Sequence, residues 1–256
     1  EDTLRAEEGR KKINRIIKKY LLKTADIYFP YSKDAKLFLE KNKITDNCYQ
    51  SSWSINPTLF RKSLDKIDIF RTKYHLDSQK NIYTIASALI PLKGIKQFIN
   101  AWKEMPEDFL AKTELNILGS GPLEQELKQL VKDSNMEENV MFRGKLPYNE
   151  VADFFTCTDV FVLPTLQDLC SLTIFEAIAS GLPVMTTIYN GARDLVHEGK
   201  NGYIFDPENK ESIKEALAAM DKADLKAMSM ESQAIAAEYT DDKVMKKFYE
   251  ILKGLM

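Results

Sequence analysis

The sequence lacks a long apolar run, a paired set of cysteines and a cluster of histidines. No apolar segment approaches the roughly 20 residues that a membrane-spanning helix requires. The three cysteines, Cys48, Cys157 and Cys170, are odd in number and have no CxxC spacing. They argue against a disulfide framework or a zinc knuckle and fit a reducing compartment. The two histidines, His75 and His197, stand far apart, so we predict no metal site.

The charges are nearly balanced, with 36 lysines and arginines against 38 aspartates and glutamates, and a formal net charge of −2. This balance gives no general electrostatic attraction to nucleic acid, so we predict no nucleic-acid partner. Hydrophobic residues make up 44% of the 256 positions, which is enough for one full core. The composition therefore indicates a globular protein.

Short apolar runs alternate with amphipathic helical patterns along most of the chain. The strand-like runs lie at 27–29, 48–52, 82–86, 115–118, 140–142, 160–163, 184–187 and 203–205. Helical patterns such as 95–102 and 123–131 separate most of them, and the chain from Lys210 onward is helical in pattern. This alternation predicts an α/β fold, with a Rossmann-like parallel sheet and helices on both faces. Ligands of such sheets bind beyond the carboxyl ends of the strands.

Two carboxylates lie eight residues apart across a predicted strand-to-helix junction. Asp168 follows the buried run that ends at Pro164, and Glu176 lies about one and a half turns inside a helix that begins at Ser171 and stops at Gly181. Taken alone, the two acids fit an ordinary loop and an ordinary helix surface. The first turn of such a helix can also hold phosphate, and a carboxylate within it can accept hydrogen bonds from ribose hydroxyls.

Four sequence blocks surround this pair in a regular order. They are Leu118-Gly-Ser-Gly-Pro-Leu-Glu, Asn139-Val-Met-Phe-Arg-Gly, Ala177-Ile-Ala-Ser-Gly-Leu-Pro-Val and Asn201-Gly-Tyr-Ile-Phe-Asp-Pro. With Asp168 in the first place of a Glu, seven residues, Glu signature, the segment Leu115–Pro207 resembles the donor-binding domain of glycosyltransferase family 4. These are the group 1, retaining enzymes of GT-B fold.

The resemblance implies transfer of a sugar, with retention, from a nucleoside-diphosphate sugar to a glycan or lipid-linked acceptor. It implies no metal and no other cofactor. Three residues take the predicted catalytic places: Lys93 at the donor diphosphate, Glu176 at the ribose and Asp168 at the donor sugar. The pathway that the resemblance suggests is polysaccharide biosynthesis.

The resemblance also implies a set of donor-binding residues around these three. They are Ser87, Gly119, Gly121, Arg143, Ser171, Leu172, Thr173 and Gly191. The two glycines after Leu118 fit a tight strand-to-helix turn equally well, and Arg143 also fits a solvated strand end. A dinucleotide fingerprint fails, because Glu124 holds its third glycine position, which argues against NAD binding.

The chain departs from the family pattern at three positions of the predicted site. Ala88 stands where an arginine is expected, Ser171 stands where a glycine is usual, and Asp168 replaces glutamate. A lysine alone lacks the planar fork with which arginine binds phosphate. Two accounts remain: a transferase with an unusual donor, or a non-catalytic nucleotide-sugar-binding or regulatory module. We favour the transferase because Lys93, Glu176 and the glycine turns are present.

Two segments are predicted by analogy with the complete GT-B fold. Residues 1–60 resemble a remnant of the acceptor-side domain and its linker, and residues 61–256 the donor-binding domain with C-terminal helices. We therefore expect a truncated chain that lacks the N-terminal domain and is inactive alone. The basic, amphipathic segment Arg10–Lys23 fits peripheral contact with an anionic membrane, or packing on the absent domain. The predicted location is the cytoplasm, or the inner face of the cell membrane.

Overall fold

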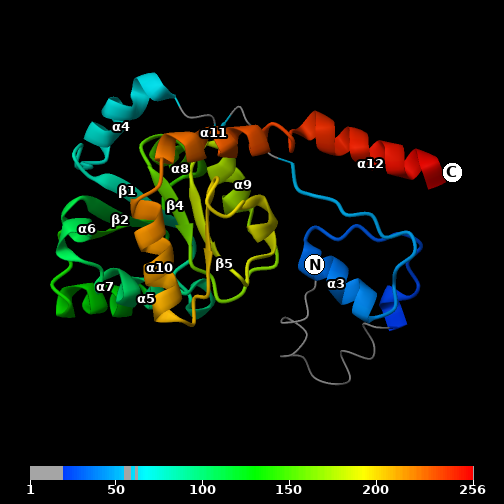
Figure 1. The fold of residues 1–256 in the computed structure, drawn as a ribbon, viewed down its shortest axis with the longest axis horizontal. Helices are drawn as coiled ribbons and strands as arrows, with labels where there is room; N and C mark the ends of the chain where they lie inside the picture. Colours follow the sequence, from blue (N-terminus) through cyan, green and yellow to red (C-terminus); the bar gives the residue numbers. More distant parts are fainter. Residues whose placement is uncertain (1–19, 55–58, 61–62, 256) are drawn as a thin grey trace.

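The centre of the molecule is a six-stranded, all-parallel sheet (Figure 1). The computed structural model describes residues 20–54, 59–60 and 63–255. The strands are β1 (Asn81–Ala86), β2 (Thr113–Leu118), β3 (Val140–Gly144), β4 (Val160–Leu163), β5 (Val184–Thr187) and β6 (Gly202–Phe205). They lie in the order β3-β2-β1-β4-β5-β6. The predicted Rossmann-like parallel sheet is confirmed.

Helices cover both faces of this sheet, as predicted. On one face, Tyr83 and Ile85 of β1 join a core with α5 (Ile95–Trp102), α6 (Glu107–Ala111), α7 (Glu124–Asp133) and α10 (Lys210–Asp221). On the other face, Ile82 and Ala86 join a core with α8 (Tyr148–Thr156) and α9 (Leu172–Ala179). The alternation along β1 follows from the pleat of the strand. Two further helices, α4 (Ile67–Lys73) and α11 (Leu225–Ala236), pack against α8 and α9 respectively.

The order of the strands reverses between β1 and β4, which pair directly through Tyr83 with Val160 and Thr84 with Phe161. After β1 the chain continues to β2 on one side of this pair, and after β4 it continues to β5 on the other side. Sheets of this order bind ligands at this switch point, beyond the carboxyl ends of the strands. The loop after β1 ends in the short helix η2 (Pro91–Lys93), and the loop after β4 leads into α9.

The N-terminal part of the described chain contains α3 (Lys33–Lys41), whose first turn is capped by Ser32, and residues 20–22 are also helical. The strands predicted at 27–29 and 48–52 are wrong, because these segments share only an isolated parallel bridge between Tyr28 and Cys48. The Tyr28 N–H donates to the Asn47 carbonyl, and the Tyr28 carbonyl accepts from the Tyr49 N–H. The next donor along this side is residue 30, a proline, which has no N–H with which to extend the ladder.

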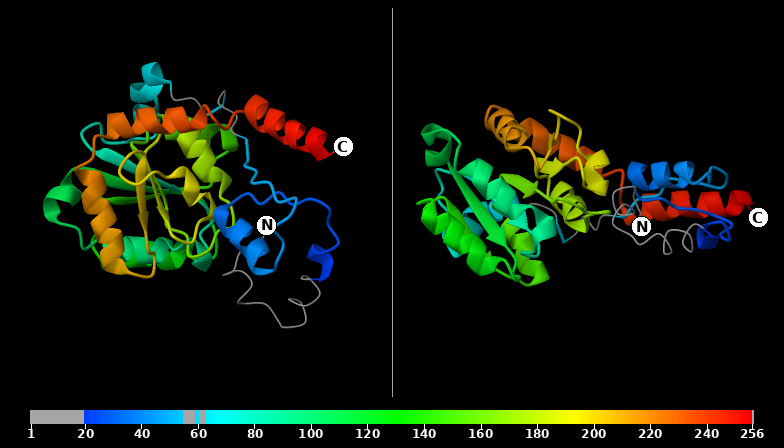
Figure 2. Two further views of the ribbon diagram at one scale, coloured as in Figure 1. Left: turned by 45° about the vertical axis from the view of Figure 1, so that its right-hand side comes forward. Right: turned by 90° about the horizontal axis from the view of Figure 1, so that it is seen from below.

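The last helix, α12 (Asp241–Leu255), continues beyond α11 and lies beside the N-terminal part (Figure 2). Its Phe248 ring lies 4.7 Å from that of Phe29, measured between centroids. The helical pattern predicted from Lys210 onward is confirmed by α10, α11 and α12. In the part of the chain that the structure describes, no helix combines the length and apolarity of a membrane span. The segment Arg10–Lys23 lies outside the described residues up to residue 19.

Candidate functional site

Lys93 and Asp168 meet across the switch point. Lys93 ends η2 after β1, Asp168 lies in the loop after β4, and Lys93 Nζ is 2.5 Å from Asp168 Oδ2. Their side chains are only 22% and 14% exposed, so this ion pair is largely shielded from water. The backbones of the two loops are joined as well, because the Leu166 amide donates to the Leu92 carbonyl at 2.8 Å. The structure thus brings together two of the three predicted catalytic residues.

The loop after β5 holds Asp168 from the other side. The amide of Gly191 donates to the Asp168 carbonyl at 2.9 Å, and a Cβ on Gly191 would lie 1.7 Å from the carbonyl oxygen of Leu169. Gly191 is therefore required by the contact between two backbones. Asn190, the residue before Gly191, has a negative φ. Its φ is −96°, and its side chain caps the short helix η3 (Gly191–Leu195) by accepting from the Ala192 amide.

Glu176, the third predicted catalytic residue, projects from α9 and accepts a hydrogen bond from the Tyr148 hydroxyl at 2.8 Å. Burial raises the pKa of Glu176, and the bond from Tyr148 lowers it in part. Desolvation of the hydroxyl, together with the adjacent Glu176 carboxylate, raises the pKa of Tyr148 to about 12. Tyr148 therefore remains a donor at neutral pH and holds one carboxylate oxygen of Glu176 in place.

A cavity of about 320 Å³ lies beside Glu176, a size within the usual range for small-ligand sites. Its lining comes from the loops after β1, β2 and β3 and from α8 and α9, and includes Ser87, Ala88, Gly119, Lys145, Thr173 and Glu176. Four of the predicted donor-site residues thus line one space. Sequence reasoning missed Lys145 and Tyr148, although both follow β3 at the edge where ligands were expected.

The glycine turn after β2 packs loop against loop. Gly119 has a φ of +138°, and a Cβ there would lie 1.9 Å from the carbonyl oxygen of Ser87. A Cβ on Gly121 would lie 2.5 Å from the carbonyl oxygen of Leu89. A tight turn therefore accounts for both glycines, and Gly119 additionally lines the cavity. Gly121 is not among the residues that line it.

Arg143 is engaged away from the cavity. Its Nε donates to Asn116 Oδ1 at 2.6 Å, and its Nη2 lies 3.3 Å from Glu114 Oε1. Glu114 is 4% exposed and Asn116 is fully buried, so the guanidinium compensates a buried carboxylate of the neighbouring strand β2. This placement does not support the predicted contact of Arg143 with the base or phosphate.

The start of α9 has no side-chain cap. Ser171 takes the N-cap position with extended backbone angles, but its side chain makes no capping hydrogen bond. Its hydroxyl lies 3.4 Å from that of Thr173 instead. The predicted N-cap position is confirmed, while the capping bond is not formed. Leu172, in the first turn, is 49% exposed.

The described ranges contain no group of three or more His, Cys, Asp or Glu side chains that could hold a metal ion. The chemistry at the switch point rests on one lysine, two carboxylates and the positive end of α9. Such a set can bind a diphosphate and a polyhydroxylated ligand.

Comparison with known proteins gives the family. Residues 66–237, about two thirds of the chain, match the model described as "Glycosyl transferases group 1". The chain is 27% identical over 214 residues to the poly(glycerol-phosphate) alpha-glucosyltransferase of Bacillus subtilis, covering 80% of this chain and 30% of that protein. It is 25% identical over 206 residues to the lipopolysaccharide glucosyltransferase WaaG of Escherichia coli, covering 74% of this chain and 54% of that protein.

Among solved structures, HepE of Anabaena in complex with UDP superposes with a TM-score of 0.86 at 18% identity. The match covers 98% of this chain and 70% of HepE, and at this identity it shows the fold. The chain thus spans 30% and 54% of the two curated relatives above. The match over residues 66–237 places this chain in the group 1 glycosyltransferase family, and its sheet is the Rossmann-like domain of the GT-B fold.

Proposed function

We propose that this chain binds a nucleoside-diphosphate sugar and that the protein transfers the sugar, with retention, to a glycan or lipid-linked acceptor. The observation that carries the proposal is the meeting of Lys93 and Asp168 at the switch point, in loops at the same edge of the sheet as the loops that line the cavity with Glu176. A cation, two carboxylates and a helix N-terminus without a side-chain cap match the charges and hydroxyls of such a donor.

Each residue has a role that its surroundings support. Glu176 has one carboxylate oxygen bonded to Tyr148, and the other can accept from the ribose hydroxyls. In this proposal Lys93 and the first turn of α9 bind the diphosphate, and both stabilise the negative charge that develops on it as the sugar leaves. The role proposed for Asp168 is to accept hydrogen bonds from hydroxyls of the donor sugar. No protein nucleophile and no metal are part of this proposal.

Uridine is the base to test first. Structures of HepE, which shares this fold, are described as complexes with UDP and with UDP-glucose. The lining of the cavity near Glu176 also includes the apolar side chains of Leu146 and Val151, which suit the face of a base.

Calorimetry with UDP, GDP and ADP and their common sugar conjugates tests the donor site. We expect one diphosphate nucleotide to bind wild-type protein and to lose at least about ten-fold in affinity in Glu176→Ala, because a charge-assisted hydrogen bond is removed. Glu215→Ala, an exposed glutamate of α10, is the matched control and should bind as wild type does. Equal binding by Glu176→Ala and wild type would remove Glu176 from the site. Binding of NAD alone would replace the proposal with a dinucleotide-binding one.

A second candidate function is a non-catalytic nucleotide-sugar-binding or regulatory module. The observation in its favour is Ala88, which lines the cavity where the family resemblance implies an arginine. Ala88→Arg in the full-length protein, where transfer can be measured, separates the two. A site that has lost its function should gain donor affinity from the guanidinium group of the new arginine, whereas a site adapted to another donor should lose transfer activity.

The proposed location is the cytoplasm, with contact to the inner membrane face through Arg10–Lys23. The support is the sequence of that segment, which is basic on an amphipathic pattern and has no acid. Flotation with vesicles containing anionic lipid tests it: the protein should rise with these vesicles and not with neutral ones. If the protein stays in the bottom fraction with both anionic and neutral vesicles, the proposed membrane contact is refuted.

A further inference from the structure

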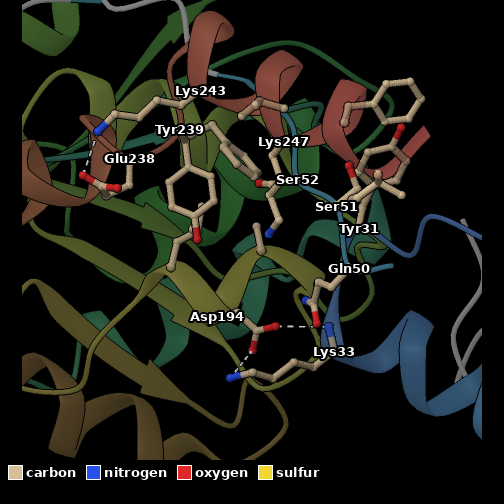
Figure 3. Close-up of a pocket in the computed structure, with 17 residues that line it drawn as sticks. Tyr31, Lys33, Gln50, Ser51, Ser52, Asp194, Glu238, Tyr239, Lys243 and Lys247 are labelled. Atoms are coloured by element: carbon tan, nitrogen blue, oxygen red, sulfur yellow. Dashed lines mark hydrogen bonds and ion pairs between the residues drawn. The ribbon is translucent and has the colours of Figure 1, made fainter. Parts of the chain in front are cut away.

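A larger cavity, of about 600 Å³, lies where the N-terminal part, the sheet domain and α12 meet (Figure 3). Phe175 of α9 lines it, whereas the next residue, Glu176, lines the cavity of the proposed donor site. The two cavities therefore flank the same helix. Nothing in the proposed donor chemistry uses the larger one.

The cavity carries one uncompensated positive charge. Of its three lysines, Lys33 pairs with Asp194 at 3.4 Å and Lys243 pairs with Glu238 at 2.9 Å. Lys247 has no carboxylate within ion-pair distance in the described part of the chain, and Figure 3 shows its side chain directed into the cavity. Lys247 is an exposed residue of α12, so a ligand can reach its ammonium group, and its attraction for an anion is strongest at low salt. The cavity is therefore suited to a ligand with a negative charge.

The remaining lining is polar and aromatic. Gln50 and Ser51 contribute an amide and a hydroxyl, and the Tyr31 ring stacks on Trp53 with centroids 4.9 Å apart. Tyr239 also lines the cavity, where burial raises the pKa of its hydroxyl and keeps it a donor. Hydroxyl and amide groups beside aromatic faces suit a sugar ring, which has a polar rim and apolar faces.

The cavity is in backbone contact with the proposed donor site. Gly191 lines it, and the Gly191 amide donates to the carbonyl of Asp168, whose carboxylate contacts Lys93. We propose that this cavity binds a phosphate-bearing carbohydrate, with the phosphate on Lys247, and that this ligand is the acceptor. Its identification as acceptor rests on the proposed function, whereas the binding itself does not.

Calorimetry at low salt with UDP present tests this site, with glucose 1-phosphate, glucose and inorganic phosphate as probes. UDP occupies the donor site, so the probes report on the second cavity. We expect glucose 1-phosphate to bind more tightly than either fragment, because it alone engages both the lysine and the polar lining. Lys247→Gln should weaken it about ten-fold or more. Lys246→Gln, which removes the same charge from the adjacent residue of α12, should leave it unchanged.

Several results would overturn the proposal: no binding of glucose 1-phosphate, equal weakening by both substitutions, or binding of inorganic phosphate as tight as that of the sugar phosphate. Unchanged UDP affinity in Lys247→Gln shows that the variant is folded. If the wild-type protein binds glucose 1-phosphate but not UDP, the proposed donor site is refuted and the site at Lys247 is not. A glucose phosphate esterified to a short polyprenol distinguishes the two sources of the ligand. If the ligand is lipid-linked, this ester should bind more tightly than glucose 1-phosphate. If the ligand is soluble, the two compounds should bind with equal affinity.

Discussion

Replacing Asp168 with asparagine should strengthen UDP binding while it weakens the folded state. In the free protein, Lys93 Nζ lies 2.5 Å from Asp168 Oδ2 in a pair that is largely shielded from water. A phosphate that binds Lys93 must therefore compete with a carboxylate already in contact with it, and must approach the charge of that carboxylate. Asparagine keeps the shape of the side chain and removes the charge, so it ends the competition.

The size of the effect follows from the distance. At 2.5 Å and an effective dielectric constant of about 20, the attraction is roughly 6.6 kcal/mol before desolvation is subtracted. Net couplings between contacting charges are far smaller, so we expect Asp168→Asn to lower the free energy of unfolding by about 1 to 2 kcal/mol. That corresponds to a fall of about 2 to 8 °C in Tm. If a tenth of the attraction passes to bound phosphate, UDP gains about 0.7 kcal/mol, or about three-fold in affinity.

Calorimetry with UDP near neutral pH and low salt measures the affinity, and thermal unfolding measures the stability. Asp153→Asn is the matched control, since Asp153 also pairs with a lysine, Lys73 at 3.5 Å, but lies on the exposed side of α8. It should change neither UDP affinity nor, by more than a few tenths of a kcal/mol, stability. Unchanged or weaker UDP binding by folded Asp168→Asn would refute the competition for Lys93.

Three further predictions concern the neighbouring residues. Tyr148→Phe removes the hydrogen bond that lowers the pKa of Glu176, so that pKa should rise. Because UDP binding needs the ionised carboxylate, acidification should abolish it at a higher pH in the variant than in the wild type. Calorimetry across pH measures this shift. Gly119→Ala places a Cβ 1.9 Å from a carbonyl oxygen and should lower the free energy of unfolding in urea by about 3 kcal/mol or more. Arg193→Asp breaks the pair with Asp34 and should cost about 1 kcal/mol, and adding Asp34→Arg should restore most of the lost Tm.

Each of these has an outcome that would contradict it. An acid limit of UDP binding that is the same with and without the Tyr148 hydroxyl would show that Glu176 does not titrate there. Gly199 also has a positive φ, of +71°, but open space around a Cβ, so Gly199→Ala should cost only about 1 kcal/mol. Equal losses at Gly119 and Gly199 would rule out the steric contact. No recovery in the doubly substituted chain would mean that Arg193 and Asp34 do not act as a pair.

The fold was predictable where apolar runs are long enough and separated by helical patterns. Six of the predicted strands form the sheet. Each run is buried between two layers of helices, so its backbone N–H and C=O groups can form hydrogen bonds only with parallel neighbouring strands. The prediction failed at residues 27–29 and 48–52, where hydrophobicity suggests strands and Pro30 prevents the ladder from extending. A proline at the next donor position was visible in the sequence and would have corrected the interpretation.

The sequence predicts which loops gather at one edge of the sheet around the candidate site, but not the side-chain contacts within it. Residues after parallel strands share one edge of the sheet, which is why Ser87, Gly119 and Thr173 line a single cavity with Glu176. Which partner a long side chain reaches depends on packing that periodicity does not encode. The buried Glu114 on strand β2 needed a cation, and that need, rather than the donor, accounts for the conformation of Arg143.

Helix α9 joins the proposed donor site to the larger cavity. Phe175 and Glu176 are adjacent and about 100° apart around the helix axis, so each lines a different cavity. The start of the same helix lies at the switch point, next to the loop that Gly191 ties to Asp168. A ligand that shifts α9 or η3 from the larger cavity must therefore shift carboxylates of the donor site as well. Binding at the two cavities should be coupled, and any change that glucose 1-phosphate makes in UDP affinity should be matched by UDP in the affinity for glucose 1-phosphate.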